Sequence, residues 1–163
     1  MSVEFEVIDI EKPADTNIII GQAHFIKTTE DVYEALITSV PNIRFGFAFC
    51  ESSGKRLIRI EGNDEELKKL AIENALKIGA GHSFVLLIRN AWPINILNTL
   101  KMVHEITSIY CATANPVQVI VAQTNKGRAI LGIVDGGTPL GVEKEEDIKE
   151  RREFLRRIGY KLA

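Results

Sequence analysis

The chain has 163 residues, of which 45% are hydrophobic and 26% are charged, and its formal net charge is −2. These proportions are typical of a soluble globular domain, so they disfavour the disordered, fibrous and membrane-spanning classes. The near balance of charge also disfavours nucleic acid as a partner, because phosphate backbones are bound by clustered Lys and Arg. We expect a single domain over residues 1–163, long enough to bury its own core.

The first residues and the two cysteines bear on the cellular compartment. Residues 1–9 lack the basic and apolar regions of a signal peptide, and no apolar run approaches the roughly 20 residues that span a bilayer. Cys50 and Cys111 lie far apart in apolar stretches, so we interpret them as buried thiols in a reducing compartment. The sequence predicts a cytoplasmic protein that does not contact a membrane.

The first part of the chain predicts strands, a helix and a hairpin. In chain order these are strands over residues 3–10 and 17–25, a helix from Thr28 to Val40, and paired strands over residues 44–50 and 56–60. Apolar and acidic residues alternate in the first strand, which is typical of a half-buried strand. Pro41 ends the helix, and the turn around Gly54 fits an antiparallel hairpin.

The middle of the chain predicts a helix, a buried strand and a second helix. Asn63 or Asp64 caps the first helix, and Gly79 follows it as a left-handed C-cap. Residues 84–88 are continuously apolar, as in a strand that is covered on both faces. Pro93 opens the second helix, which we expect to run to about residue 105.

The last part predicts three strands and a charged helix. The strands cover residues 108–113, 117–124 and 128–135, and the short turn 125–127 joins the last two into a hairpin. Residues 143–160 predict a helix with Ile148, Leu155 and Ile158 facing inward. The whole pattern predicts the α/β (α+β) class: one domain with a mixed β-sheet, two hairpins and about four packed helices.

Three junctions rich in glycine and other turn residues are candidate ligand-binding segments. They are residues 79–83, 113–116 and 134–138. Glycine lets backbone N–H groups approach a ligand, and ligands of α/β proteins collect at strand ends. Each segment alone is typical of an ordinary turn, so the predicted pocket depends on the three together.

His82 is the leading candidate for a catalytic residue. It lies between a helix end and a buried strand, with Gly81 and Ser83 on either side. An imidazole there could act as a general base or accept a phosphoryl group; the alternative is a hydrogen-bonded structural histidine. His24 is the competitor for this role, and we interpret His104 as structural or exposed.

Asp135 is the second candidate for a catalytic role. It precedes two glycines at a strand end, where a carboxylate could hold a ribose hydroxyl or a magnesium ion. Asp-Gly-Gly is also a common turn. Asn95 could offer its amide to a base or a phosphate, and Trp92 could stack on a base, although a core anchor is its commoner role.

Familiar nucleotide and hydrolase motifs are missing from the sequence. It contains no G-x-x-x-x-G-K-[ST], no G-x-G-x-x-G that opens a helix after a strand, no G-x-S-x-G and no H-E-x-x-H. A Walker phosphate loop, a Rossmann site, a hydrolase elbow and a zincin site are therefore not expected.

Seven short strings, spread over nearly the whole chain, carry a resemblance to a known family. They are GQAHF at 21–25, FAFCESSG at 47–54, EGND at 61–64, GAGHSF at 79–84, PINILN at 93–98, ATANPV at 112–117 and GIVDG at 132–136. Together they resemble the adenosine-specific kinase family of archaea and bacteria.

The resemblance implies an α/β fold that binds adenosine or adenine nucleotides such as AMP, a phosphorylated histidine, and a homo-oligomer, which we expect to be a trimer or a hexamer. It also implies ATP or another phosphoryl donor, with Mg²⁺ as an optional companion and no metal ligand among the residues. We assign the phosphorylated histidine to His82. The ligand-binding residues that we expect are Gly81, Ser83, Asn95, Asn115, Pro116, Gly136 and His24.

These expectations combine into one hypothesis, a phosphotransferase that acts on adenosine. The nucleoside would lie among the turns at 115–116 and 135–136 while His82 relays the phosphoryl group, with Arg59, Arg89 or Mg²⁺ as the neutralising cation. This requires the imidazole to face a cavity shared with those turns. The alternative function is a nucleotide-sensing module without turnover.

Overall fold

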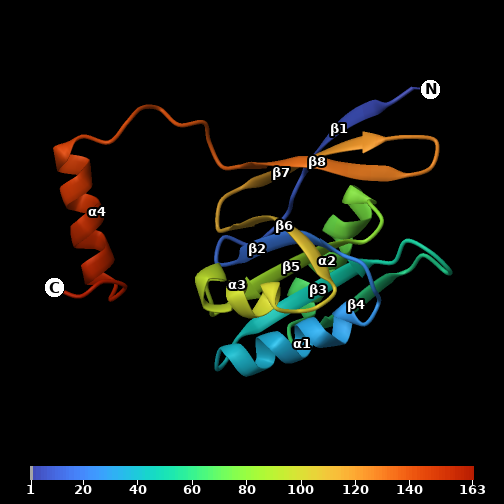
Figure 1. Ribbon diagram of the computed structural model, residues 1–163, viewed down its shortest axis with the longest axis horizontal. Coiled ribbons are helices and arrows are strands. Elements are labelled where there is room, and N and C mark those ends of the chain that lie inside the picture. Colours follow the sequence, from blue (N-terminus) through green and yellow to red (C-terminus); the bar gives the residue numbers. More distant parts are fainter. Residues whose placement is uncertain (1) are drawn as a thin grey trace.

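The computed structural model describes residues 2–163, which form eight strands and four helices (Figure 1). The elements are β1 (Glu4–Asp9), β2 (Asn17–Ala23), α1 (Thr28–Ser39), β3 (Arg44–Cys50), β4 (Ile58–Gly62), α2 (Glu65–Ile78), β5 (Ser83–Arg89), α3 (Pro93–Lys101), β6 (Ile106–Thr113), β7 (Val117–Gln123), β8 (Arg128–Asp135) and α4 (Glu145–Arg157). The predicted α+β class and both hairpins, β3–β4 and β7–β8, are confirmed.

The strands fall into two sheets. One has five strands in the order β4-β3-β5-β2-β6, and the other has three in the order β1-β7-β8. All pairs within the two sheets are antiparallel. Figure 1 shows the three-stranded sheet above the five-stranded sheet.

Two cores hold these layers together. On one face of the five-stranded sheet, α1 and α3 cover a cluster that contains Phe45, Phe47, Phe49 and Phe84. On the other face, α2 and the three-stranded sheet enclose a second cluster. Because side chains alternate along a strand, β3 and β5 supply both clusters, which explains why residues 84–88 are continuously apolar.

Local sequence signals position α2 on the sheet. The Asp64 side chain accepts a hydrogen bond from the Leu67 N–H at 3.2 Å, and Gly79 ends the helix at φ 62°. At Gly46 on β3, a Cβ atom would come within 2.2 Å of the backbone at Leu67. Glycine at this position therefore allows α2 to pack closely against β3.

Three expectations from the sequence are wrong at the surface. In β1 only Ile8 is buried, because no element covers the outward face that carries Phe5 and Val7. Trp92 is 58% exposed and is not a core anchor. α4 buries none of its residues, so Leu155 and its predicted inward partners meet no core of their own chain.

None of the helices in residues 2–163 has the length and apolar character needed to traverse a bilayer.

Candidate functional site

The candidate residues lie at two opposite ends of the five-stranded sheet. Both ends can be located along β2, which pairs with β5 on one side and β6 on the other. Ser83 lies opposite Gln22, whereas Thr113 lies opposite Ile18. These two rows are about 13 Å apart along the strand.

His82 lies at the first of these ends, immediately before β5. Its backbone has φ 62°, in the left-handed region that residues other than glycine and asparagine rarely adopt. Two hydrogen bonds hold this conformation: the His82 N–H donates to the Cys50 carbonyl at 2.7 Å, and the His82 carbonyl accepts from the Ala23 N–H at 2.9 Å. Strain of this kind, held by neighbouring strands, is common at functional sites.

The half-buried imidazole is oriented by an aromatic neighbour. Its ring stacks on Phe49, with ring centroids 5.8 Å apart and an interplanar angle of 16°. Phe49 pairs with Arg59 across β3 and β4, and directly opposed residues of an antiparallel pair point to the same face. The guanidinium of Arg59 therefore emerges on the face that carries the imidazole.

Arg59 is only partly engaged by its neighbours. One of its terminal nitrogens donates to a Glu51 carboxylate oxygen at 3.2 Å, while its buried Nε has no hydrogen-bond partner within residues 2–163. The same Glu51 oxygen accepts the Leu57 N–H at 3.1 Å, and this backbone hydrogen bond, followed by the charge of Arg59, lowers the pKa of Glu51 below its usual value. A buried N–H without a partner favours an anionic ligand oxygen.

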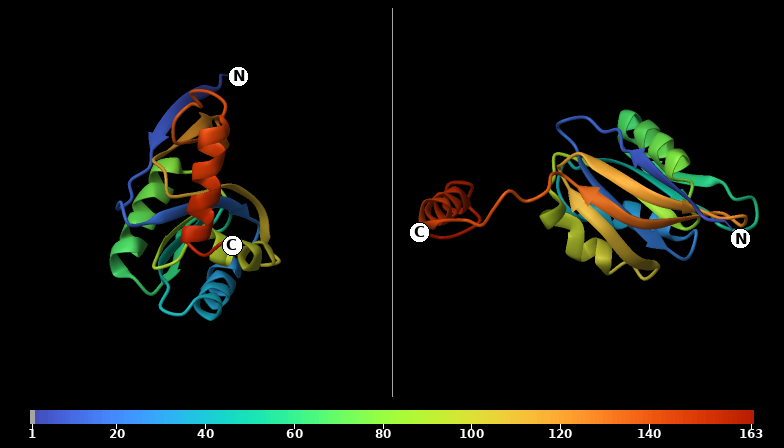
Figure 2. Two further views of the ribbon diagram at one scale, coloured as in Figure 1. Left: turned by 90° about the vertical axis from the view of Figure 1, so that its left-hand side faces the viewer. Right: turned by 90° about the horizontal axis from the view of Figure 1, so that it is seen from above.

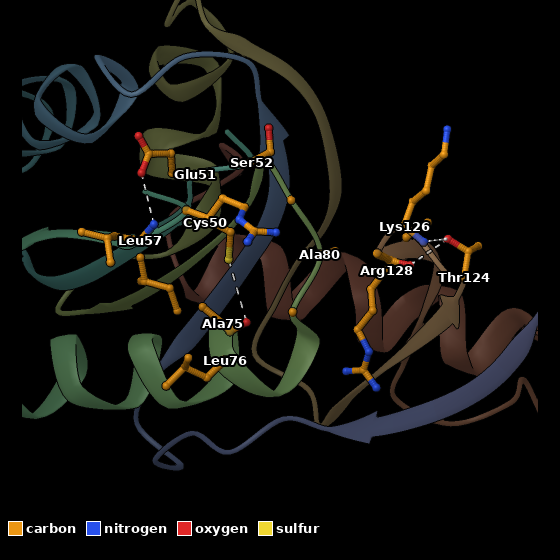
Figure 3. A pocket seen from close by; sticks show the side chains of 16 residues that line it. Cys50, Glu51, Ser52, Leu57, Ala75, Leu76, Ala80, Thr124, Lys126 and Arg128 are labelled. Atoms are coloured by element: carbon orange, nitrogen blue, oxygen red, sulfur yellow. Dashed lines mark hydrogen bonds between the residues drawn. The ribbon is translucent and has the colours of Figure 1, made fainter. Parts of the chain in front are cut away.

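A cleft of 540 Å³ opens beside Ala80 and Gly81, the two residues that precede His82 in the chain (Figure 3). Its walls are the 50–58 hairpin, the 79–81 turn with the end of α2, and the 124–129 hairpin. In Figure 3, Cys50 and Glu51 lie on one side, Lys126 and Arg128 lie on the other, and Ala80 lies between them. The predicted glycine segment 79–83 thus lines a cavity through Gly79, Ala80 and Gly81.

Positive charge predominates among the side chains that line this cleft. Arg56, Lys126 and Arg128 face a single carboxylate, Glu51. Arg128 is already engaged, because its guanidinium donates to the Lys77 carbonyl at 2.7 Å and pairs with Glu6. Within the described chain, Arg56 and Lys126 form no ion pair, so they remain available to an anion.

The other end of the sheet holds the second group of predicted residues. Asp135 accepts hydrogen bonds from the Thr113 hydroxyl at 2.8 Å and from the Asn115 amide at 3.0 Å. The Gly136 N–H donates to the Pro116 carbonyl at 3.0 Å, and Gly136 has φ 66°. These residues are brought together as predicted, but their polar groups bond mainly to one another.

This arrangement contradicts the hypothesis of a single shared cavity. His82 lies beside the Gln22 end of β2, and Asp135 is bonded to Thr113 at the Ile18 end. The error arose because both segments adjoin strands, and the antiparallel register that separates them cannot be derived from either segment alone. Within one chain, a ligand between the 115–116 and 135–136 turns would not reach the imidazole.

The remaining candidates have separate locations. Ser83 is buried and donates to the Ala80 carbonyl at 2.7 Å, so its hydroxyl stabilises the turn. His24 is exposed next to the His82 end and stacks on Phe25. Asn95 accepts the Trp92 N–H at 2.8 Å as a cap of α3. Arg89 lies at the far end of β5 and pairs with Asp15, Asp64 and Glu66.

Metal ligands and reactive thiols are the two kinds of side chain that could serve a cofactor. In residues 2–163, no three His, Cys, Asp or Glu side chains gather closely enough to hold a metal ion. Burial raises the pKa of the Cys50 thiol, and it raises the pKa of Cys111 to about 11, so both thiols remain protonated at neutral pH.

Sequence reasoning did not identify the cations of the cleft. Arg56 and Lys126 lie in hairpin turns, where charged residues are normally solvated, and their convergence depends on an isolated bridge between Ala80 and Arg128. The only local signal was the Asn125–Gly127 turn, which was recognised as a hairpin and not as one wall of a cavity.

Fold and site together define a class: a small α+β protein with a cationic cleft at the end of the sheet where His82 lies. The chain belongs to the adenosine-specific kinase family, because the family model described as "Adenosine specific kinase" matches residues 8–161. The family indicates a kinase that acts on adenosine and uses a phosphoryl donor. No curated protein matches the chain.

A solved structure supports the fold over the whole chain. The crystal structure of the PH1918 protein from Pyrococcus horikoshii OT3 is 52% identical and has a TM-score of 0.96. The match covers 99% of this chain and 100% of that one.

Proposed function

We propose that this protein transfers a phosphoryl group from ATP to adenosine, with His82 as the group that carries it. The observation on which the proposal depends is the setting of His82. Its left-handed backbone is held from both sides, its ring is fixed on Phe49, and it follows directly on Gly81 in the wall of the cleft. An imidazole held in one orientation is suited to nucleophilic catalysis.

In the proposed first step, a ring nitrogen of neutral His82 attacks the γ-phosphorus of ATP. The new P–N bond forms as the bond from phosphorus to the β,γ-bridging oxygen breaks, and ADP leaves. In the second step, the adenosine 5′-hydroxyl attacks the phosphorus, the P–N bond breaks, and the hydroxyl proton passes to solvent. The products are AMP and regenerated His82.

Cations at the same end of the sheet support this chemistry. Arg59 has an unpartnered Nε on the imidazole's face, and Arg56 and Lys126 line the cleft without ion pairs. Developing charge on a transferring phosphoryl group is stabilised by such preorganised donors. The cleft volume of 540 Å³ falls in the range of small-molecule sites.

Magnesium is treated separately, because the protein offers little to hold it. Glu51 is the single carboxylate among the residues that line the cleft, and it already binds Arg59. A Mg²⁺ ion normally takes one or two carboxylates together with phosphate oxygens. The donor set does not fit a protein-held ion, so no step of the proposal depends on one.

The test is to map the phosphate after incubation with γ-labelled ATP, with and without adenosine. Asparagine tolerates positive φ, so His82→Asn removes the imidazole without disturbing the backbone. We expect acid-labile label in the wild type, in His24→Asn and in the matched control His104→Asn, and none in His82→Asn. AMP formation should follow the same pattern; label or AMP from His82→Asn would refute the assignment.

A binding module without turnover is the second candidate function. It is favoured by one observation: the residues that line the cleft include Gly81 but not His82. Calorimetric binding of adenosine or AMP, with no label on the protein and no AMP after long incubation with ATP, would establish this function instead. In either case we propose that the molecule acts as a homo-oligomer, a trimer or a hexamer, located in the cytoplasm.

A further inference from the structure

Residues 136–163 form an arm that leaves the body of its own chain. Beyond Gly136 the chain runs without regular structure to α4, and α4 stands well apart from both sheets (Figures 1 and 2). After the bond from the Gly136 N–H to Pro116, the hydrogen bonds and ion pairs that the arm forms within residues 2–163 join only arm residues.

The arm carries apolar side chains that its own chain leaves in solvent. Leu140, Val142 and Leu162 are each at least 90% exposed, and Phe154 and Ile158 on or next to α4 are 48% and 42% exposed. A helix of 13 residues is marginally stable by itself in water. Both facts indicate that the arm packs against another surface.

The course of the arm is the same in a related protein. The solved structure that is 52% identical superposes with a TM-score of 0.96 over 99% of this chain. The arm makes up 28 of the 163 residues, so a score this high requires the arm of the relative to project in the same direction. A shared course of this kind, in a segment that is not bonded to its own body, indicates support from another molecule.

The outer face of the three-stranded sheet is an apolar surface without a cover. The register aligns Val7 with Ile120 and Ile120 with Gly132 across the three strands. Phe5 is 72% exposed, Val7 56% and Leu131 57%. No helix of the same chain lies over this face when it is viewed from above (Figure 2), and a sheet face of this composition is normally buried against another layer.

The dimensions of the arm and of this face correspond. α4 is about 20 Å long, and the strands of the sheet have a similar length. At Gly132, in the middle of β8, a Cβ would meet nothing within 4 Å, which leaves space for a side chain from a helix above. The arm is also near charge balance, with acidic residues in the first turn of α4 and basic residues in its last, so it brings little net charge to an apolar surface.

From these observations we infer that the arm of one copy docks on a second copy of this chain, with the apolar stripe of α4 against the outer face of the β1-β7-β8 sheet. The exchange supplies the helix layer that this sheet lacks in its own chain. It rests on the proposed homo-oligomer, for which it names the interface, and it makes no use of the His82 chemistry, so the two proposals can fail separately.

The first experiment measures molar mass in solution by light scattering for the full chain and for point variants of the arm. We expect an oligomer for the wild type and a monomer for Ile158→Glu and for Phe154→Asp. Neither side chain is buried in its own chain, so the monomer should keep its circular dichroism. Lys161→Glu is the matched control and should remain oligomeric. A monomeric wild type, or oligomeric Ile158→Glu and Phe154→Asp, would overturn the inference.

The second experiment tests the acceptor face. Chains with Leu131→Cys are mixed, unfolded, refolded together with chains that carry Ile158→Cys, and then oxidised; the native cysteines are buried. We expect a disulfide-linked pair made of one chain of each kind. Thr38→Cys on α1 replaces Leu131→Cys in the control and should give no such pair. Equal yields from the test and the control would show that α4 docks elsewhere.

Discussion

The two ends of the five-stranded sheet carry polar residues of two different kinds. At the Asp135 end, the carboxylate is occupied by Thr113 and Asn115. At the His82 end, the buried Nε of Arg59 has no partner in the described chain, and two further cations line an open cleft. Polar residues at a strand end therefore indicate a ligand site only where the fold has not already used their hydrogen bonds.

The backbone shows the same contrast. His82 and Arg56, at the cleft end, have φ 62° and 52°. At the other end the left-handed positions next to Asp135 and in the turn after β5 are Gly136 and Asn90, residue types that adopt this conformation readily. Strain is thus concentrated at the end that we propose to be functional.

The largest effect should come from Arg59. Arg59→Gln removes the cation on the imidazole's face, and loss of one such donor costs on the order of 10²-fold in the transfer rate. Arg59→Lys should recover part of this rate because the charge is restored. Single-turnover labelling of His82 measures both.

Arg44→Gln is the matched control for that prediction. Arg44 also pairs with a carboxylate, that of Asp64, but its side chain is 48% exposed and it begins β3, far from His82. Its labelling rate should stay within about twofold of the wild type, since exposed ion pairs contribute about 0–1 kcal/mol. A similar loss in both variants would contradict a special role for Arg59.

A smaller effect is expected from the cations of the cleft. In Arg56→Ala/Lys126→Ala, the affinity for AMP should fall about tenfold, as expected when two partly exposed charges are lost, while the affinity for uncharged adenosine is retained. Calorimetry at low and high salt measures this difference. If Lys55→Ala/Lys101→Ala, on the surface, weakened AMP equally, the cleft would not be the phosphate site.

Asp135→Ala should affect stability and leave catalysis intact. The variant leaves the Thr113 hydroxyl and the Asn115 amide without their acceptor, which costs about 1 kcal/mol and lowers Tm by about 2–4 °C for a domain of this size. Labelling of His82 should be unchanged. A loss of label without a loss of stability would indicate that Asp135 takes part in catalysis.

The last effect concerns the thiols and is confined to alkaline pH. The pKa of Cys111 is raised to about 11, so above pH 9 the unfolded chain loses this proton while the folded chain keeps it, and stability falls as pH rises toward 11. Below pH 9 the thiol contributes no pH dependence. Cys111→Ser should flatten the alkaline limb of a denaturation series.

Cys50 provides a comparison with Cys111. Cys50 lines the cleft and Cys111 does not, so AMP should slow the reaction of a thiol reagent with Cys50 only. Equal protection of both thiols would indicate general stabilisation and not occupancy of the cleft.

Much of the fold was predictable from local signals. The caps at Asp64 and Gly79, the stop at Pro41 and the apolar run of β5 each act within a few residues, and each predicted element is present. The exposed faces of β1 and α4 were not predictable, because an apolar stripe indicates that a face is buried but not which chain buries it.

The site was predictable only in part. The glycine segment identified His82 and Gly81, since its signal is contained in adjacent residues. Arg59 was a candidate cation from the sequence, and the β3–β4 hairpin places it opposite Phe49. Lys126 comes to this end through long-range register, and long-range register also carries Asp135 away from it. Spacing along the sequence holds no information about either displacement.

The most direct test of the account is amide hydrogen exchange with and without AMP. The account predicts slower exchange in residues 51–57, 79–83 and 124–128, with no change in residues 113–116 and 134–137. Protection of the second set without the first would place the ligand at the Asp135 end and contradict the central claim.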